Sequence, residues 1–424
     1  MTAAIRQAVI LAGGKGTRLG EITRAVPKPM LPIAGDKLFL DYLLEMIERH
    51  GYQDILLLGG YLGEVLEAAY GGRRIGDATI RVLREKVPLG TAGALTVARE
   101  ALDPHFLMMN GDAFFDINLR ALEQASYQSE AMATLALRSV PDAARYGRVI
   151  EEQGNVVAFL EKDLNRRGPG VINGGVYVLK REILDLVRDL PCSLEQDVFP
   201  VLVERGQIRG CEFDGYFLDI GLPETLEQGH LELPNVRMRP AVFFDRNALV
   251  SFPEGGSILP EAIHWARGAV EAIRLLNDHQ HYVFVVSNSS AGAHRTRAAA
   301  DARLLNAAMQ ERLAHEGAYV DRFYGELESP SDIASGHAID AAKQKPDASL
   351  VHQAMNEWPI IRERSFFIGV SSNDIEAARS AGISWRVLNG GDLARLVHSL
   401  LGLPHKAPQL ELSKPDRRWN PARR

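Results

Sequence analysis

The sequence predicts an α/β fold in two domains, and three observations lead to this prediction. The chain has 424 residues, whereas a single hydrophobic core usually stops growing at roughly 250–300 residues. Short apolar runs alternate with amphipathic stretches in both halves, which is typical of parallel strands connected by helices. Residues 230–240 read HLELPNVRMRP, with two prolines and no clear periodicity, so we expect a linker between the domains there.

The composition excludes several classes of protein. The apolar fraction of 46%, the charged fraction of 24% and the net charge of -6 are typical of an ordinary globular chain without a general attraction for nucleic acid. Cys192 and Cys211 are too few for a disulfide framework. The N-terminal residues MTAAIRQAVILAGG contain no apolar run long enough for a signal peptide or a membrane span. We therefore expect a cytoplasmic protein that binds neither nucleic acid nor membrane.

The first half has the pattern of a doubly wound, Rossmann-like sheet. Residues 5–12, IRQAVILA, are predicted to form a buried strand. Residues 37–50 are predicted to form a helix, because Leu40, Leu43 and Ile47 recur at helical spacing. In sheets of this kind, ligands bind outside the carboxyl ends of the strands. Further strands are expected at 54–58, 79–83 and 106–109, with a helix around 62–69.

A second α/β series begins after the expected linker. Its strands are predicted at 241–245 (AVFFD), 282–288 and 365–370, and its helices near 268–279 and 296–315. The last twenty residues are basic and rich in proline, which is typical of a loosely held tail. We therefore expect a first domain at 1–235, a second domain at 236–404 and a flexible tail at 405–424.

A glycine-rich loop follows the first predicted strand. Its sequence, Gly13-Gly14-Lys15-Gly16-Thr17-Arg18, can present backbone N–H groups to phosphates, because glycine allows close approach. The spacing fits neither the G-x-G-x-x-G fingerprint nor the P-loop, which needs lysine followed by serine or threonine. Arg18 and, further on, Lys28 add two cations that suit a triphosphate about to lose pyrophosphate. The alternative is that the glycines only make a tight turn.

Five segments narrow this choice because of their order along the chain. They read VILAGGKGTRL (9–19), PKPMLPI (27–33), EKVPLGTAGAL (85–95), NGD (110–112) and LDIGLPE (218–224). Together they resemble the sugar-1-phosphate nucleotidylyltransferases. The resemblance implies that a sugar phosphate oxygen attacks the α-phosphorus of a nucleoside triphosphate and that pyrophosphate leaves. Such a reaction needs positioning and charge neutralisation more than a covalent nucleophile.

The resemblance assigns catalytic roles to five charged residues. Arg18 would lie along the leaving phosphates, and Lys28 would bridge the α-phosphate and the incoming sugar phosphate. Asp112 and Asp219 would hold Mg²⁺, since carboxylates offer the oxygen ligands that this ion prefers. Lys162 would hold the sugar phosphate. The residues expected around the nucleotide are Leu11, Ala12, Gly13, Gly14, Gly16, Thr17, Glu85, Pro88, Gly90 and Thr91.

The sugar side of the site follows from the same resemblance. Glu161 would accept hydrogen bonds from sugar hydroxyls beside Lys162. For Tyr146 and Tyr177 an alternative stays open, in which each is a partly buried core aromatic whose hydroxyl bonds the backbone. The segments that match sugar-contacting parts of the family contain Tyr146, Gly147, Asn173 and Tyr177.

The segment around Glu85 bears on the choice of base. It most resembles guanylyltransferases of the mannose-1-phosphate and heptose-1-phosphate kind. The Glu85 carboxylate could pair with the N1–H and the N2 amino group of guanine, which adenine does not present in that arrangement. Alternatively, Glu85 is a surface partner for Arg84 or Lys86. GTP is therefore favoured, and other nucleoside triphosphates stay open.

The second half resembles the haloacid dehalogenase phosphatases, in particular the branch that handles heptose bisphosphate and histidinol phosphate. Asp245 stands in the place of the nucleophile, Ser287 in that of the phosphate-binding hydroxyl, and Lys345 in that of the phosphate-binding lysine. Asp374 is a further carboxylate in the region where the family binds its metal ion. The expected phosphatase site therefore has an outline in the sequence.

Two of the groups that this chemistry needs are replaced. Asn247 stands where the family has its acid and base aspartate, and an amide cannot transfer a proton. Val370 stands where the family has a metal-binding aspartate. We therefore expect a phosphatase-like domain with impaired or no turnover, retained for assembly, regulation or binding of sugar phosphates.

The pairing of the two domains bears on the sugar. In bacterial heptose activation a bisphosphate phosphatase acts just before a nucleotidylyltransferase, so the fusion favours a heptose 1-phosphate or a cyclic relative. Mannose 1-phosphate or glucose 1-phosphate with the same chemistry is one alternative. A regulatory protein that binds sugar phosphates without turnover is another. We also expect a homo-oligomer, with a dimer surface on the second domain.

Overall fold

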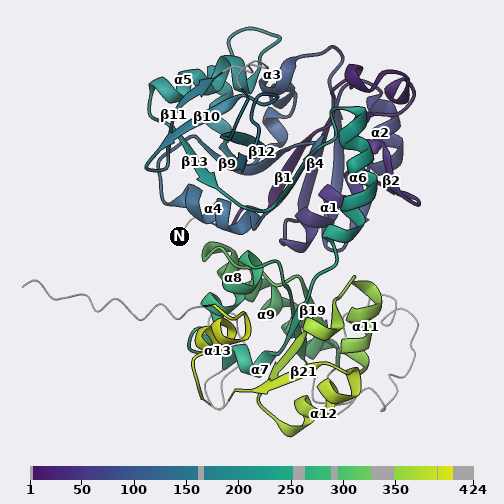
Figure 1. Ribbon diagram of the computed structural model, residues 1–424, viewed down its shortest axis with the longest axis vertical. Coiled ribbons are helices and arrows are strands. Elements are labelled where there is room, and N and C mark those ends of the chain that lie inside the picture. Colours follow the sequence, from purple (N-terminus) through teal and green to yellow (C-terminus); the bar gives the residue numbers. More distant parts are fainter. Residues whose placement is uncertain are drawn as a thin grey trace, which may run out of the picture.

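The computed structural model describes residues 3–160, 167–251, 263–287, 295–325, 348–388 and 390–403. Within these ranges the chain forms two main β-sheets covered by helices, which appear as the two lobes of Figure 1. The α/β fold predicted for both halves is confirmed. The tail expected at 405–424 lies outside the described residues. None of the helices in the described ranges is long and apolar enough to span a membrane.

The sheet of the first lobe has the strand order β10-β11-β13-β9-β12-β7-β1-β4-β6-β5. It is parallel across β7, β1, β4 and β6, as expected, but β12 runs antiparallel to both of its main neighbours, so the sheet is mixed rather than largely parallel. The strands are β1 Gln7–Leu11, β4 Asp54–Gly59, β5 Arg74–Ile75, β6 Ala78–Arg84, β7 His105–Asn110, β9 Ala133–Val140, β10 Arg148–Glu152, β11 Asn155–Leu160, β12 Gly170–Lys180 and β13 Ile208–Glu212.

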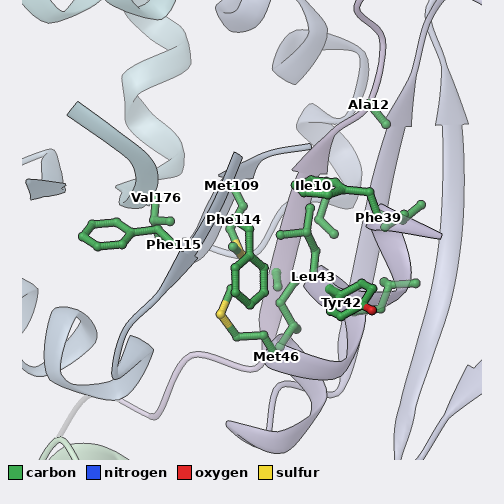
Figure 2. Packing of buried hydrophobic residues seen from close by; sticks show 14 of the residues in the cluster. Ile10, Ala12, Phe39, Tyr42, Leu43, Met46, Met109, Phe114, Phe115 and Val176 are labelled. Atoms are coloured by element: carbon green, nitrogen blue, oxygen red, sulfur yellow. The ribbon is translucent and has the colours of Figure 1, made fainter. Parts of the chain in front are cut away.

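Both faces of this sheet are buried. Ala8 and Ile10 of β1 pack on one side and Val9 on the other, because alternate side chains of a strand point to opposite faces. Figure 2 shows Ile10 packed beside Leu43 of α1, with Met109 and Phe114 close by. The helices are α1 Phe39–Arg49, α2 Gly63–Tyr70, α3 Gly90–Val97, α4 Leu119–Tyr127, α5 Phe199–Glu204 and α6 Pro223–Val236. Short 3-10 or π turns are η1 Thr17–Thr23, η2 Lys28–Met30, η3 Arg99–Ala101, η4 Arg181–Leu186 and η5 Leu194–Val198.

A separate antiparallel ribbon lies beside the sheet. It consists of β8 Ala113–Asp116 and β14 Tyr216–Asp219, with Ala113 opposite Asp219 and Asp116 opposite Tyr216. Asp112 directly precedes β8, so this register brings Asp112 and Asp219 to the same end of the ribbon. A shorter ribbon pairs β2 Pro32–Ala34 with β3 Lys37–Leu38.

The expected linker at 230–240 is wrong for most of its length, because α6 continues to Val236. Leu226, Gly229 and Leu233 are buried along one side of the helix. Pro234 lies in the last turn, where the missing N–H removes one helical hydrogen bond but does not prevent the preceding turns from forming. Burial of one helix face therefore outweighs the proline signal.

The second sheet has the order β19-β18-β15-β20-β21, and every described pairing in it is parallel. Its strands lie at or within two residues of the predicted positions where a prediction was made. Phe243 and Phe284 pack with ring centroids 5.2 Å apart in its core. The elements are β15 Ala241–Asp245, α7 Arg246–Leu249, β16 Val250–Ser251, β17 His264–Trp265, α8 Ala269–Asp278, β18 Tyr282–Ser287, α9 Arg295–His315, β19 Arg322–Gly325, α11 Ser349–Glu357, η8 Arg362–Arg364, β20 Phe366–Gly369, α12 Ser372–Ala381, β21 Ser384–Val387 and α13 Leu393–Leu400.

One buried hydroxyl allows a test of the second sheet. Ser365 is fully buried, and its Oγ accepts the Ala241 N–H at 2.9 Å and donates to the Ile361 carbonyl at 2.7 Å. Replacing Ser365 by alanine leaves both backbone groups without this partner, so the free energy of unfolding should fall by about 1–3 kcal/mol. Urea denaturation measures the change. Ser251→Ala, at an exposed position of β16, is the control and should stay within about 0.5 kcal/mol of the parent.

Candidate active site

A buried lysine joins two carboxylates at the carboxyl edge of the first sheet. Lys28, in η2, is 6% exposed. Its Nζ lies 2.6 Å from Oδ2 of Asp112 and 3.9 Å from Oδ1 of Asp219. The backbone N–H of Gly221 donates to Asp219 Oδ1 at 2.6 Å and fixes that carboxylate. The structure therefore brings together three of the charged residues predicted from the sequence.

The electrostatics of this cluster suit an added cation. Burial raises the pKa of Asp219, and the negative charge of Asp112 raises it further. Lys28, the Gly221 N–H and Arg18 act in the opposite direction. Among the described residues no three His, Cys, Asp or Glu side chains form a metal-binding group. Two carboxylates alone leave a divalent ion most of its coordination sites for phosphate and water oxygens.

A cavity of about 650 Å³ opens beside Lys28 and Asp112. It lies where ligands of doubly wound sheets bind, outside the carboxyl ends of β1, β4 and β7. The predicted nucleotide residues that line it are Leu11, Ala12, Gly13, Gly14, Glu85, Pro88, Gly90 and Thr91. Lining residues that the sequence analysis did not select are Lys15, Pro29, Leu58, Gly60, Tyr61, Lys86, Val87, Ala94 and Asn110.

The first glycine of the loop is required by close packing. A Cβ on Gly13 would lie 2.9 Å from Glu85 Oε1 and 3.1 Å from the Gly60 nitrogen. Gly60 has the same constraint, because its own Cβ would collide with Glu85 Oε1. Gly60 directly follows β4, so a search of all strand ends for glycine would have identified it. The loops that contain Gly13 and Gly60 therefore both pack against the Glu85 carboxylate at the cavity wall.

Glu85 faces the cavity rather than a neighbouring cation. Its Oε2 accepts the Leu89 N–H at 3.1 Å, and burial raises the pKa of its carboxyl. Arg84 instead pairs with Glu67 at 2.9 Å and with Glu64 at 3.9 Å. In the part of the chain that the structure describes, Glu85 forms no ion pair with Arg84 or Lys86. The alternative of a surface ion pair for Glu85 is therefore not what the structure contains.

The end of the glycine loop lies outside the cavity lining. Gly16 has a φ of 62°, and a Cβ there would lie 2.9 Å from Thr23 Cγ2, so it turns the chain into η1. Thr17 and Arg18 are exposed in η1. Arg18 is close enough to Asp219 to help lower the pKa of that carboxyl. The predicted roles of Gly16, Thr17 and Arg18 remain predictions.

A hydrogen-bonded chain connects the cavity wall to β12. Tyr177 is fully buried, and its hydroxyl accepts from Asn173 Nδ2 at 2.8 Å and donates to Glu195 Oε1 at 3.5 Å. Glu195 Oε2 also accepts the Thr91 hydroxyl at 3.0 Å. The alternative of a core aromatic fits Tyr177, although its hydroxyl bonds side chains rather than backbone. Glu195 was not selected because an isolated glutamate in a π turn has no sequence signal.

Tyr146 is half-buried near the carboxylate cluster. Its ring meets Phe217 of β14 edge to face, with centroids 5.9 Å apart. Burial raises the pKa of the Tyr146 hydroxyl, and the charge of Asp219 adds to the effect. A Cβ on the adjacent Gly147 would lie 3.1 Å from the Leu160 carbonyl, so this turn is closely packed. Glu161 and Lys162, predicted for the sugar, lie outside the described residues.

In the second lobe, three adjacent parallel strands end at one edge. Asp245 ends β15, and its Oδ1 accepts the Asn247 N–H at 2.8 Å, while Ser287 ends the neighbouring β18. Asp374 Oδ2 accepts the Val370 N–H at 3.0 Å and the Ser371 hydroxyl at 2.9 Å. This aspartate is buried and caps α12. Lys345 lies outside the described residues.

Comparisons with known proteins agree with this geometry. A nucleotidyl transferase family matches residues 7–235, and a haloacid dehalogenase-like hydrolase family matches residues 333–387. The D-glycero-α-D-manno-heptose 1-phosphate guanylyltransferase of Campylobacter jejuni is 38% identical over 51% of this chain and 96% of its own length. The enzyme of the same name from Aneurinibacillus thermoaerophilus is 35% identical over 54% of this chain and 98% of its own.

A solved structure is also similar to part of this chain. The crystal structure of HddC from Yersinia pseudotuberculosis covers 54% of this chain and 100% of that chain, at 29% identity and a TM-score of 0.49. The family match extends over more than half of the sequence and includes the cavity, Lys28, Asp112 and Asp219. The chain therefore belongs to the nucleotidyl transferase family and carries a haloacid dehalogenase-like region in its second half.

Proposed function

We propose that the first domain, residues 1–235, transfers a guanylyl group from GTP to a heptose 1-phosphate and releases pyrophosphate. The observation that carries this proposal is that the glycine loop, Glu85, Lys28 and Asp112 line the same cavity of about 650 Å³. A base, a triphosphate and the charged cluster can thus share one space. The names of the two relatives from Campylobacter jejuni and Aneurinibacillus thermoaerophilus support the choice of guanine and heptose.

The bond changes of the proposed reaction place charge near Lys28. A phosphate oxygen of the sugar 1-phosphate attacks the α-phosphorus, the bond from that phosphorus to the bridging oxygen breaks, and pyrophosphate leaves with the electron pair. Lys28 is buried and points its ammonium at this region, so it would neutralise charge on both the α-phosphate and the incoming phosphate. Arg18 would approach the leaving phosphates from η1.

Asp112 and Asp219 would hold Mg²⁺, which when bound supplies charge neutralisation for the phosphates. The oxygen donors and the raised pKa of Asp219 support this assignment, because a cation would relieve the repulsion between the two carboxylates. The backbone N–H groups of the loop at Gly13 and Gly14 would orient the triphosphate.

The base would be recognised inside the cavity, and the sugar beside the carboxylate cluster. Glu85 offers two carboxylate oxygens, which match the N1–H and N2 amino donors of guanine. Tyr146 and Asn173 lie toward the carboxylate cluster and β12, where the sugar would bind together with Glu161 and Lys162. Tyr177 would act through Asn173, because it is fully buried.

We propose that the second domain, residues 236–404, has no phosphatase turnover. Asn247 and Val370 lack the proton-transferring and metal-binding carboxyl groups of the resembled enzymes, and Asp374 is engaged in capping α12. A homodimer formed through this domain and a cytoplasmic location complete the proposal.

The proposed reaction is tested by measuring pyrophosphate release with Mg²⁺, each nucleoside triphosphate and a panel of sugar 1-phosphates. We expect GTP with a heptose 1-phosphate to give the highest kcat/KM. A higher value with another pair would reassign the substrates, and inactivity with every pair would contradict nucleotidyl transfer. Phosphate release from heptose 1,7-bisphosphate should stay at the level of a buffer control, and robust turnover there would contradict the assignment of the second domain.

Lys28→Met removes the ammonium group that faces both phosphates. We expect kcat/KM to fall by about 10²–10³-fold, the effect typical of losing one preorganised donor at a developing charge. Steady-state kinetics measure the change, and thermal denaturation checks that the variant is folded. Lys37→Met is a matched control, because Lys37 pairs with Glu45 outside the cavity. Equal losses in the two variants would argue against a specific role of Lys28.

Glu85→Gln tests the recognition of the base. The glutamine amide has one acceptor and one donor group. Its NH₂ group would therefore face one of the two hydrogen-bond donors of guanine, and that hydrogen bond would be lost. The ratio of kcat/KM for GTP to that for ATP should fall by about tenfold or more, since one bidentate pair is worth roughly 1–3 kcal/mol. The control is Glu67→Gln, because Glu67 lies on α2 and its carboxylate pairs with Arg84. An unchanged ratio in Glu85→Gln would exclude Glu85 as the guanine partner.

A further inference from the structure

A buried carboxylate lies at the far end of the strand that begins beside Asp112. Asp116, the last residue of β8, is 2% exposed. Its Oδ1 lies 3.3 Å from Arg49 Nη2, and its Oδ2 contacts Arg239 Nη2. Both arginines are themselves buried. Because a buried charge is stable only when it is paired, these three side chains form one mutually dependent cluster.

This cluster extends into the second lobe. Arg49 also reaches Asp321, with Nη1 and Oδ1 3.3 Å apart. The backbone of Arg239 forms two hydrogen bonds there, to the Pro359 carbonyl at 3.2 Å and from the Ile361 N–H at 2.8 Å. Residues of the second lobe therefore bond to both arginines that pair with Asp116.

The residues next to Asp116 are held by the same lobe. Gln280 Nε2 donates to the Asp116 carbonyl at 3.2 Å. Asn118 Nδ2 donates to Asp278 Oδ1 and to the Gly317 carbonyl, each at 2.8 Å. Helix α4 of the first lobe contacts α9 of the second, on the side where the two lobes face each other (Figure 1). The end of β8 is thus docked on the second lobe by side-chain and backbone bonds.

The chain connects this docked end to both carboxylates of the active site. Four residues of β8 lead from Asp116 back to Asp112. The paired strand β14 ends at Asp219, and α6 then leads to Arg239. The ion pair between Asp116 and Arg239 therefore closes a circuit that runs through α6, Asp219 and the pairing of β14 with β8, next to Asp112. A shift of the ribbon at the closed end would be transmitted along two short, hydrogen-bonded strands.

We infer that Asp116 is a positioning residue, through which the second domain fixes the β8–β14 ribbon and the relative placement of Asp112 and Asp219. This inference rests on the proposed function, because it assigns the metal-holding carboxylates as the groups that are positioned. It gives the phosphatase-like domain a part in nucleotidyl transfer without any turnover of its own.

A purely stabilising role would have different consequences. Buried ion pairs contribute little net stability, because desolvation offsets much of their attraction, so stability alone is a weak reason to bury two aspartates and two arginines at one joint. Loss of a stabilising pair would lower the melting temperature and leave the Mg²⁺ requirement unchanged. Loss of a positioning pair would raise the Mg²⁺ concentration needed for half-maximal rate.

The test uses the full chain with Asp321→Asn, which removes the second-domain carboxylate from Arg49 without altering the first domain, and with Asp116→Asn. Glu48→Gln is the matched control, because the pair of Glu48 with Arg322, 3.1 Å apart, also joins α1 to the second lobe. Unlike the pair of Asp321 with Arg49, it has, among the described residues, no ion pair that continues to Asp116 of the ribbon. We measure half-saturating Mg²⁺ at saturating substrates, and hydrogen–deuterium exchange of peptides that contain β8 and β14.

We expect Asp321→Asn to raise half-saturating Mg²⁺ by at least about fivefold, the lower range of couplings between linked sites, with a smaller change in the KM for GTP. Exchange of β8 and β14 should become faster in the same variant and stay unchanged in Glu48→Gln. Unchanged Mg²⁺ dependence and exchange in folded Asp321→Asn would overturn the inference.

If Asp116→Asn folds, its half-saturating Mg²⁺ and its exchange in β8 and β14 should change more than those of Asp321→Asn. If Asp116→Asn does not fold, Asp321→Asn alone tests the inference. The exchange measurement needs no turnover. Failure of the proposed function would therefore appear as an inactive parent protein, while exchange would still report whether Asp321 restrains the ribbon.

Discussion

Lys28 brings its ammonium group to 2.6 Å from Asp112 while only 6% of the residue is exposed, and the arrangement of the candidate active site follows from that contact. An ammonium group leaves water only where opposite charge compensates it. Asp112 supplies most of that compensation, and Asp219 adds to it from 3.9 Å. The same ammonium allows two carboxylates to share a partly buried site. An incoming phosphate would replace a carboxylate as a partner of Lys28, and an incoming cation would replace Lys28 as a partner of the carboxylates. Each of these charged groups therefore has a partner before the ligands bind.

The topology explains why these groups meet although they are far apart in the sequence. Gly13, Gly60 and Asn110 follow or end parallel neighbours β1, β4 and β7, so all three lie at one edge of the sheet. The antiparallel register of β8 and β14 then carries Asp219 to the side of Asp112. Backbone pairing thus sets the distances at the cluster, and side chains contribute the charge.

Most of the fold could be predicted from the pattern of strands and helices, and the charged cluster from the family resemblance of the segments that contain Lys28, Asp112 and Asp219. Gly60 was missed although it directly follows β4, and Glu195 was missed because contacts between distant segments leave no local pattern. Pro234 shows the opposite failure, since a local helix-breaking signal was outweighed by burial of one face of α6. Arg18 was predicted from its place in the loop; it lies in η1 outside the cavity lining, and its role stays a prediction.

The two lobes differ in which residues can change without loss of the fold. In the second lobe, Asn247 and Val370 are exposed at strand ends, so replacing the groups that the resembled phosphatases carry there disturbs no core contact. Asp321 and Arg239 lie buried at the joint between the two lobes. Asp321 pairs with Arg49 and Arg239 pairs with Asp116, so removing Asp321 or Arg239 would leave a buried charge without compensation. The proposed loss of phosphatase chemistry is therefore physically independent of retention of the joint. A domain of this kind can lose its own reaction and still determine how firmly the ribbon beneath Asp112 and Asp219 is held.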